Sequence, residues 1–121
     1  MTPADIIARG RRVIAMEQSA LGKAAARVGP EFSRAVELIA TAKGRTIVAG
    51  IGKSGLIGRK IAATLTSTGT PASFLHPTES VHGDLGIVGA SDVAILISKS
   101  GETEELLPLL EAVVQTGKPL V

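Results

Sequence analysis

A glycine-rich turn between an apolar run and an amphipathic segment constrains this chain more than any other feature. Residues 46–49 (Thr-Ile-Val-Ala) have the composition of a buried parallel strand, and residues 50–55 (Gly-Ile-Gly-Lys-Ser-Gly) follow directly. Beyond the turn, Ile57, Ile61 and Leu65 recur every four residues, which predicts a helix with one apolar face. A strand, a tight turn and a helix in this order form the repeating unit of parallel α/β sheets.

The same unit repeats along the chain. Residues 72–75 and 92–97 predict two more strands, and the second is followed by a hydroxyl-rich turn and a helix over 104–116. Pro108 is expected to kink that helix or tighten its start, because proline has no N–H to donate. Residues 76–90 are expected to form a polar loop. Right-handed crossovers then predict an α/β fold, a parallel sheet flanked by helices on both faces in a doubly wound αβα sandwich.

Two helices are expected before the first strand, over residues 4–28 and 31–42. The first carries apolar residues at seven-residue intervals, which form one stripe: Ile7, Ile14, Leu21 and Val28. The second is expected to bury Phe32, Val36, Leu38 and Ile39. We interpret residues 1–121 as a single domain, with amino-terminal helices over about 4–43 and an α/β part over about 45–121. Because only the start of a fourth strand is expected, at 120–121, we interpret the domain as truncated at its carboxyl end.

The composition excludes several classes of protein. A hydrophobic fraction of 45% excludes a disordered chain, and no run approaches the ~20 apolar residues of a membrane span. We expect no secretory signal from the first residues, and the lack of cysteine excludes disulfides and thiolate metal sites. Two Phe and no Trp or Tyr leave few rings on which bases could stack. We therefore expect a cytoplasmic protein that binds neither nucleic acid nor membrane.

The charge is divided unevenly along the chain. Residues 1–60 carry eleven Lys or Arg against four acids, a net +7, whereas residues 61–121 carry a net −5. A basic amino-terminal half is compatible with a nucleic-acid or membrane surface. The alternative is a set of solvated helix faces with an acidic partner elsewhere in the same assembly.

The glycine-rich turn departs from two well-known nucleotide motifs. Gly50, Gly52 and Gly55 match G-x-G-x-x-G, but dinucleotide folds place an acid at the end of the next strand, and the nearest acid here is Glu79, several residues later. A nucleoside-triphosphate P-loop requires glycine where Ile47 stands. Neither motif therefore accounts for the turn.

Both turns nevertheless have the chemistry of an anion site. A helix that begins at a turn presents free N–H groups and a partial positive charge, and open α/β sheets bind ligands at the carboxyl ends of their strands. Lys53 adds a full charge, and Ser54, Ser98 and Ser100 add hydroxyl groups. Together these groups suit a phosphorylated small molecule. The alternative, that these serines only cap helices, stays open.

Five segments in this order carry a resemblance to a known family: residues 50–55, 67–71 (Ser-Thr-Gly-Thr-Pro), 76–77 (His-Pro), 82–86 (His-Gly-Asp-Leu-Gly) and 98–102 (Ser-Lys-Ser-Gly-Glu). The chain closely resembles the sugar isomerase (SIS) domain of D-arabinose 5-phosphate isomerases from about residue 13 to its end, most densely over 46–105. The resemblance implies interconversion of D-ribulose 5-phosphate and D-arabinose 5-phosphate, which feeds 3-deoxy-D-manno-octulosonate into lipopolysaccharide or capsule. It implies no cofactor, a phosphorylated pentose substrate and a homo-oligomer, a tetramer in relatives.

The resemblance also implies roles for individual residues. Lys53, His82 and Glu105 match positions that the family uses in catalysis or substrate binding. Isomerisation moves a proton through an enediolate, so we assign the base to Glu105, oxyanion or phosphate stabilisation to Lys53, and hydroxyl-proton transfer or sugar holding to His82. A carboxylate base works best when partial burial raises its pKa. Without the resemblance, Glu105 could simply favour the dipole of its helix.

Further residues are expected to contact the substrate: Ser54, Gly69, Thr70, His76, His82, Ser98, Ser100 and Thr103. His76 also matches a position where an inhibitory zinc can bind, although two histidines and no cysteine cannot close a zinc site in one chain. Three alternatives to an active isomerase remain. They are a non-catalytic SIS domain that binds a sugar phosphate as a regulator, an inactive fragment of the isomerase, and a structural assembly domain.

Overall fold

The computed structural model describes residues 1–81 and 84–115, and the chain divides into two compact units, Met1–Arg34 and Ala35–Val121. Helix α1 (Pro3–Ala25) fills most of the first unit. Its start is a capping box: the Thr2 hydroxyl accepts from the Asp5 N–H at 3.2 Å, and the Asp5 carboxylate accepts from the Thr2 N–H at 2.8 Å. The hydrogen bond from the Thr2 N–H to the Asp5 carboxylate lowers the pKa of Asp5 below its usual range. The bond from the Thr2 hydroxyl has a smaller effect in the same direction.

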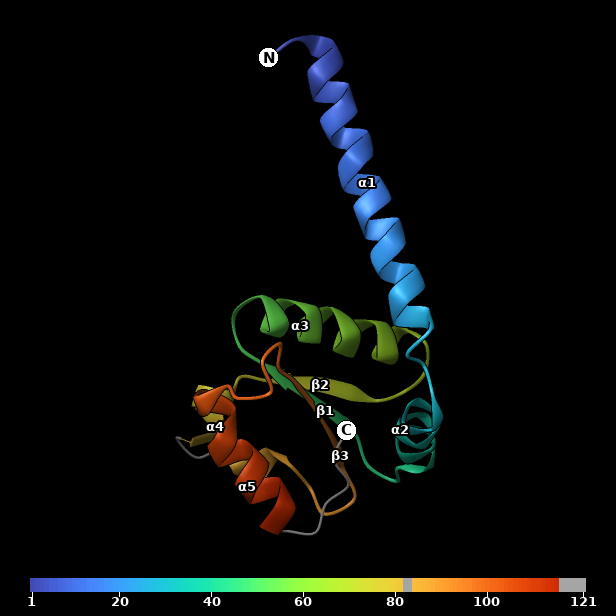
Figure 1. The fold of residues 1–121 in the computed structure, drawn as a ribbon. Helices are drawn as coiled ribbons and strands as arrows, with labels where there is room; N and C mark the ends of the chain where they lie inside the picture. The colour runs from blue at the N-terminus through green and yellow to red at the C-terminus, as the bar shows by residue number, and fades with distance from the viewer. Residues whose placement is uncertain (82–83, 116–121) are drawn as a thin grey trace. The chain divides into compact units, whose positions relative to one another are not determined.

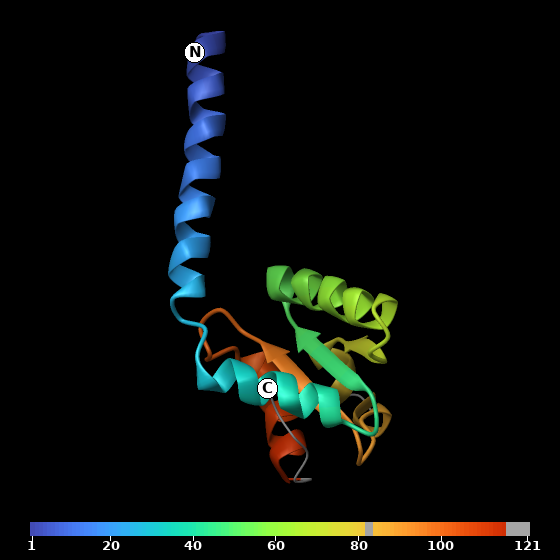
Figure 2. The same ribbon diagram turned by 90° about the vertical axis from the view of Figure 1, so that its right-hand side faces the viewer.

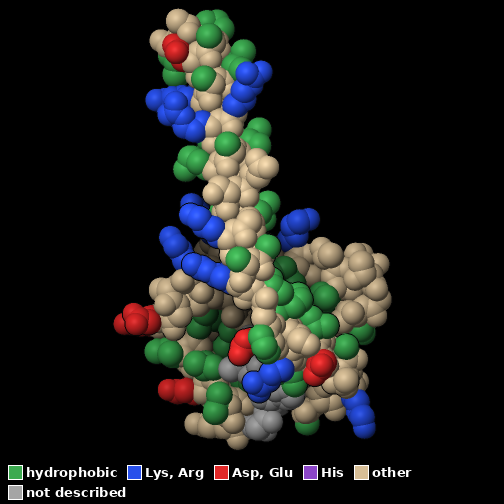
Figure 3. Space-filling view, turned by 45° about the vertical axis from the view of Figure 1, so that its right-hand side comes forward, with side chains coloured by type: hydrophobic (Ala, Val, Ile, Leu, Met, Phe, Trp, Pro, Cys, Tyr) green, Lys and Arg blue, Asp and Glu red, His purple; other side chains and the backbone are tan. Residues whose placement is uncertain are grey.

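No residue of α1 is buried, although the helix carries the expected apolar stripe. Ile14 is 67% exposed and Leu21 is 71% exposed. Figure 3 shows hydrophobic side chains together with Lys and Arg side chains along the length of this helix. None of the described helices is long and apolar enough to cross a membrane.

Helix α2 (Pro30–Thr41) crosses the boundary between the two units. The expected burial is wrong for Phe32, which is 59% exposed, and for Val36, which is 48% exposed. Leu38 and Ile39 are half-buried. An amphipathic helix buries its stripe only where another element packs against it, and the described residues do not cover Phe32 or Val36.

The second unit contains a three-stranded parallel sheet in the order β2–β1–β3. The strands β1 (Thr46–Gly50), β2 (Ala72–Leu75) and β3 (Val93–Ile97) lie where the apolar runs predicted them. All five residues of the central strand β1 are buried, as expected for a strand with neighbours on both sides.

Helices cover both faces of this sheet, which confirms the αβα class (Figures 1 and 2). Helix α3 (Gly52–Ser67) lies on one face and α5 (Leu107–Gln115) on the other. Alternate residues of β1 face opposite sides, so Ile47 and Ala49 join the core cluster that contains Leu109 of α5.

Small residues bring α3 close to the sheet. A Cβ atom on Gly58 would lie 3.1 Å from the Phe74 ring and 3.3 Å from Val48, and one on Gly55 would lie 2.6 Å from the carbonyl oxygen of Gly50. The glycine-rich turn therefore has a packing role as well as its suitability for anions. Its glycines let the start of α3 sit directly on the end of β1.

The expected loop over residues 76–90 is more ordered than predicted. It contains α4 (Pro77–Val81) and a 3₁₀ turn, η1 (Asp84–Ile87). Pro77 occupies the first helical position, a signal that the sequence interpretation missed. The helix expected over 104–116 begins as a 3₁₀ turn, η2 (Glu104–Leu106), before α5, as the position of Pro108 suggested. The strand expected at 120–121 lies outside the described residues.

Candidate functional site

Three chain segments leave the sheet together at its carboxyl edge. Gly50 of β1 pairs with Ile97 of β3, so the first and second turns start from neighbouring positions, about 4.8 Å apart as adjacent strands are. Leu75 of β2 pairs with Ala49, so His76 leaves the sheet on the other side of β1. This edge is where open α/β sheets bind their ligands.

The first turn leaves the start of α3 without a side-chain cap. Ile51 is the N-cap residue and its side chain offers no hydrogen bond, while Gly52 adopts a positive φ of 58°. Ser54 is therefore not the N-cap, which excludes the capping interpretation for this serine. Lys53 is exposed and Ser54 is half-buried, both in the first helical turn. Uncapped N–H groups beside a lysine and a hydroxyl form a suitable environment for an anion.

The second turn is held by its own hydroxyl groups. The Ser98 hydroxyl accepts from the Gly101 N–H at 3.0 Å and bonds the Thr103 hydroxyl at 2.7 Å. The Ser100 hydroxyl accepts from the Glu102 N–H at 3.1 Å, so it closes a local turn instead of capping η2. These serines shape the turn, and each hydroxyl keeps capacity for at least one further bond.

A hollow of about 270 Å³ lies beneath the second turn. Its polar lining is Ser98 and Thr103, and the rest of its wall is Gly101 and four leucines: Leu96, Leu106, Leu107 and Leu110. Lys53 and Ser54 are not part of this wall. The pairing of β1 with β3 thus brings the starts of the two turns together, and this hollow is lined from the second turn and the helix that follows it.

Glu105 lacks the burial expected of a catalytic base. It lies in η2, where its neighbour Leu106 is buried and Glu105 itself is exposed. The two residues point in different directions because the short helix uses Leu106 to contact the core. Burial of Glu105 would therefore have to come from beyond the described residues.

Gly69 and Thr70 lie at the opposite end of the strands from the carboxyl edge. Gly69, with a φ of 98°, ends α3, and the Thr70 N–H donates to the carbonyl oxygen of Leu65 at 2.8 Å. Helix α3 has 16 residues and so spans about 24 Å between the first turn and this end. Within one chain, Gly69 and Thr70 are not brought together with Lys53.

The structure describes only one of the two histidines. His82 lies outside the described residues. His76 is half-buried, and its Nδ1 lies 2.7 Å from the Thr78 hydroxyl and 3.3 Å from the Thr78 N–H. The described residues contain no group of three His, Cys, Asp or Glu side chains placed to hold a metal ion. His76 thus belongs to no such group in this part of the chain, and the expected zinc contact stays a prediction.

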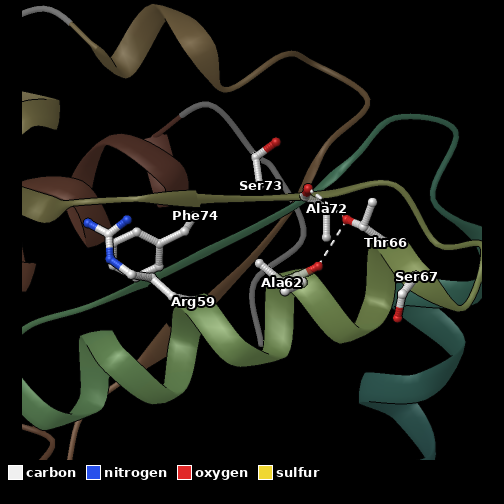
Figure 4. Close-up of a pocket in the computed structure, with 8 residues that line it drawn as sticks. Arg59, Ala62, Thr66, Ser67, Ala72, Ser73 and Phe74 are labelled. Carbon is white, nitrogen blue, oxygen red and sulfur yellow. Dashed lines mark hydrogen bonds between the residues drawn. The ribbon is translucent and has the colours of Figure 1, made fainter.

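A second hollow, which the sequence did not predict, lies between α3 and the edge strand β2 (Figure 4). Arg59 stacks on the Phe74 ring, 4.2 Å from its centroid, at one end of the hollow. The Thr66 hydroxyl bonds the carbonyl oxygens of Ala62 and Ala72 at 2.9 and 3.1 Å. Because its cation and its central hydroxyl already have partners, this hollow is a weaker candidate than the carboxyl edge.

Comparison with known proteins places this chain in a family. Residues 38–121 match the SIS domain, and the chain belongs to this family. It is 45% identical over 117 residues to the arabinose 5-phosphate isomerase KdsD of Pseudomonas aeruginosa, covering 97% of this chain and 36% of that protein. It is 47% identical over 118 residues to the arabinose 5-phosphate isomerase GutQ of Escherichia coli K12, covering 91% of this chain and 37% of the relative.

A solved structure agrees with the sequence relatives. The E. coli CFT073 protein c3406, in complex with arabinose 5-phosphate, is 42% identical to this chain with a TM-score of 0.93. The match covers 99% of this chain and 64% of that one. This chain spans little more than a third of the length of the two curated relatives quoted above.

Proposed function

We propose that this chain is part of an aldose–ketose isomerase that interconverts D-ribulose 5-phosphate and D-arabinose 5-phosphate. The observation that carries the proposal is the uncapped first turn of α3, with Lys53, placed beside the start of the second turn by the Gly50–Ile97 pairing. The relatives named arabinose 5-phosphate isomerase and the solved complex with arabinose 5-phosphate support the choice of sugar. The product would enter 3-deoxy-D-manno-octulosonate synthesis in the cytoplasm, for lipopolysaccharide or capsule.

The reaction requires a base, an electrophile and a group that handles hydroxyl protons. A base removes the proton next to the carbonyl, an enediolate forms, and the proton returns to the neighbouring carbon. We assign the base to Glu105 and stabilisation of the oxyanion or phosphate to Lys53. His82 would hold the open-chain sugar or move its hydroxyl protons. Ser54, Ser98, Ser100 and Thr103 would contribute hydroxyl groups to the bound sugar phosphate.

The active form is proposed to be a homo-oligomer. Glu105 is exposed in the described chain, and a second copy could supply the burial that a base needs. Gly69 and Thr70 lie at the far end of α3, so their expected substrate contacts also require a second copy. The exposed stripe of α1 offers an apolar surface for such an assembly.

The test is to incubate the chain with D-ribulose 5-phosphate and to follow D-arabinose 5-phosphate, while measuring pentose-phosphate binding by calorimetry. Lys53→Ala is expected to lower turnover about 10²–10³-fold, the usual effect of removing one group that stabilises a developing oxyanion. Lys60→Ala is the matched control, because Lys60 is an exposed lysine two helical turns further along α3. Equal effects of the two substitutions would contradict the assignment.

The same experiment separates the alternatives. Binding without turnover by the whole protein would favour a regulatory SIS domain. Turnover by a longer form but not by residues 1–121 would favour an inactive fragment. Neither binding nor turnover in any form would favour a structural assembly domain.

A further inference from the structure

The hydrogen bonds around His76 determine which of its ring nitrogens carries the proton. The Thr78 N–H points at Nδ1 from 3.3 Å, and a backbone N–H can only donate. If Nδ1 were protonated, two hydrogens would face each other along this line. Nδ1 is therefore an acceptor, and the Thr78 hydroxyl, 2.7 Å from the same nitrogen, must donate to it as well.

The tautomer follows from this bonding. A neutral imidazole with an unprotonated Nδ1 carries its hydrogen on Nε2. We infer that Thr78 holds His76 as the Nε2–H tautomer, which makes His76 a hydrogen-bond donor at the carboxyl edge of the sheet and Thr78 its positioning residue. Only the identity of the acceptor, an oxygen of the sugar phosphate, rests on the proposed function.

The backbone on both sides of His76 is also held in place. Its carbonyl oxygen accepts from the N–H groups of Glu79 and Ser80 at 3.0 and 3.2 Å, so His76 caps α4 with both main chain and ring. Pro77 and Ser80 are fully buried, and the Ser80 hydroxyl donates to the Pro77 carbonyl. The ring therefore starts from a constrained backbone and can reach Thr78 without rearrangement of α4.

This arrangement limits the chemistry of His76. A neutral Nε2–H group can donate to an anionic oxygen, but it has no lone pair with which to accept a proton or bind a metal. Moving the proton to Nδ1 would break both bonds from Thr78. His76 is therefore suited to orient a sugar phosphate, and the base must be another group.

The experiment is ¹H–¹⁵N NMR of the histidine rings at alkaline pH, where imidazole is neutral. The chain has two histidines, so His82→Gln leaves His76 as the single ring signal. The expected spectrum shows an unprotonated Nδ1 and a protonated Nε2. A protonated Nδ1 would overturn the inference, whether or not the chain binds a sugar.

Variants of Thr78 test the positioning role. Thr78→Val removes the hydroxyl and is expected to move both ring ¹⁵N shifts toward those of a free histidine peptide, whereas Thr78→Ser keeps the hydroxyl and is expected to keep the wild-type shifts. Unchanged shifts in a folded Thr78→Val variant would overturn the role of the Thr78 hydroxyl as a positioning group. If that variant does not fold, the test rests on Thr78→Ser. Loss of the wild-type His76 tautomer in Thr78→Ser would then overturn the role of Thr78.

Addition of D-arabinose 5-phosphate tests the donor role. The Nε2–H proton signal is expected to shift together with the backbone N–H signals of residues 52–54. Shifts at residues 52–54 without a shift at His76 would overturn donation to the sugar phosphate. No shift at either place would count against the proposed function, and the tautomer result would stand on its own.

Discussion

Asp92 illustrates how a single side chain joins two strands. It is 5% exposed, and its two carboxylate oxygens accept from the N–H groups of Arg45 at 2.6 Å and Gly89 at 2.7 Å. These bonds tie the start of β1 to the loop before β3. Because both bonds are partly buried, an N–H group that lost its acceptor would lower stability, so the contact between β1 and this loop uses both carboxylate oxygens.

Asp92→Asn tests this role at the scale of one residue. The amide keeps one oxygen but turns an NH₂ group toward the second N–H, so we expect a loss of about 1–3 kcal/mol in the free energy of unfolding. Urea denaturation measures the change. Ser91→Ala alters an exposed neighbour and should leave stability nearly unchanged. A similar midpoint for both variants would show that Asp92 contributes little.

At the scale of secondary-structure elements, two glycines within helices play opposite roles. Gly55 in α3 packs against β1, where an added Cβ would lie 2.6 Å from the Gly50 carbonyl oxygen. Gly22 in α1 has no atom within 4 Å of the corresponding position. The same residue type is thus required in one helix and only tolerated in the other.

Alanine at these two positions should therefore change stability in opposite directions. Gly55→Ala must push α3 away from the sheet, and we expect a loss of about 1–3 kcal/mol. Gly22→Ala removes backbone freedom in an open helix and should raise helix stability by about 0.5–1 kcal/mol. Thermal unfolding followed by circular dichroism measures both, and a destabilised Gly22→Ala would contradict this interpretation of α1.

At the scale of the whole molecule, the exposed apolar stripe of α1 is suited to pack against another protein surface. Helices gain most of their stability in water by packing an apolar face, yet Ile7, Ile14 and Leu21 are 56%, 67% and 71% exposed. Arg9 and Arg12 lie off the stripe, and the half of the chain after residue 60 is acidic. These features favour one explanation of the uneven charge, in which the basic half of the chain faces an acidic partner in the same assembly. They favour it over a nucleic-acid or membrane surface.

A lysine on the stripe should therefore reduce self-association. We expect the wild-type chain to form oligomers in sedimentation equilibrium and Ile14→Lys to shift the population toward the monomer. Ser19→Lys adds the same charge on the opposite side of α1 and should leave the oligomer intact. A monomeric wild type, or equal dissociation of both variants, would contradict assembly through the stripe.

Sequence alone determined the strands, the longer helices, the αβα class and the residue types present in the two turns. These follow from local periodicity and residue type, which each segment carries by itself. The motif segments also indicated the SIS family, which the comparisons confirmed.

Only the tertiary structure decided which segments meet. The register of β1 with β3 places Gly50 next to Ile97, while the length of α3 puts Gly69 at the other end of the strands. The exposure of Glu105 and of Phe32 depends on what packs around each side chain. Burial and contact are properties of residues distant in sequence, so no local pattern could have predicted them.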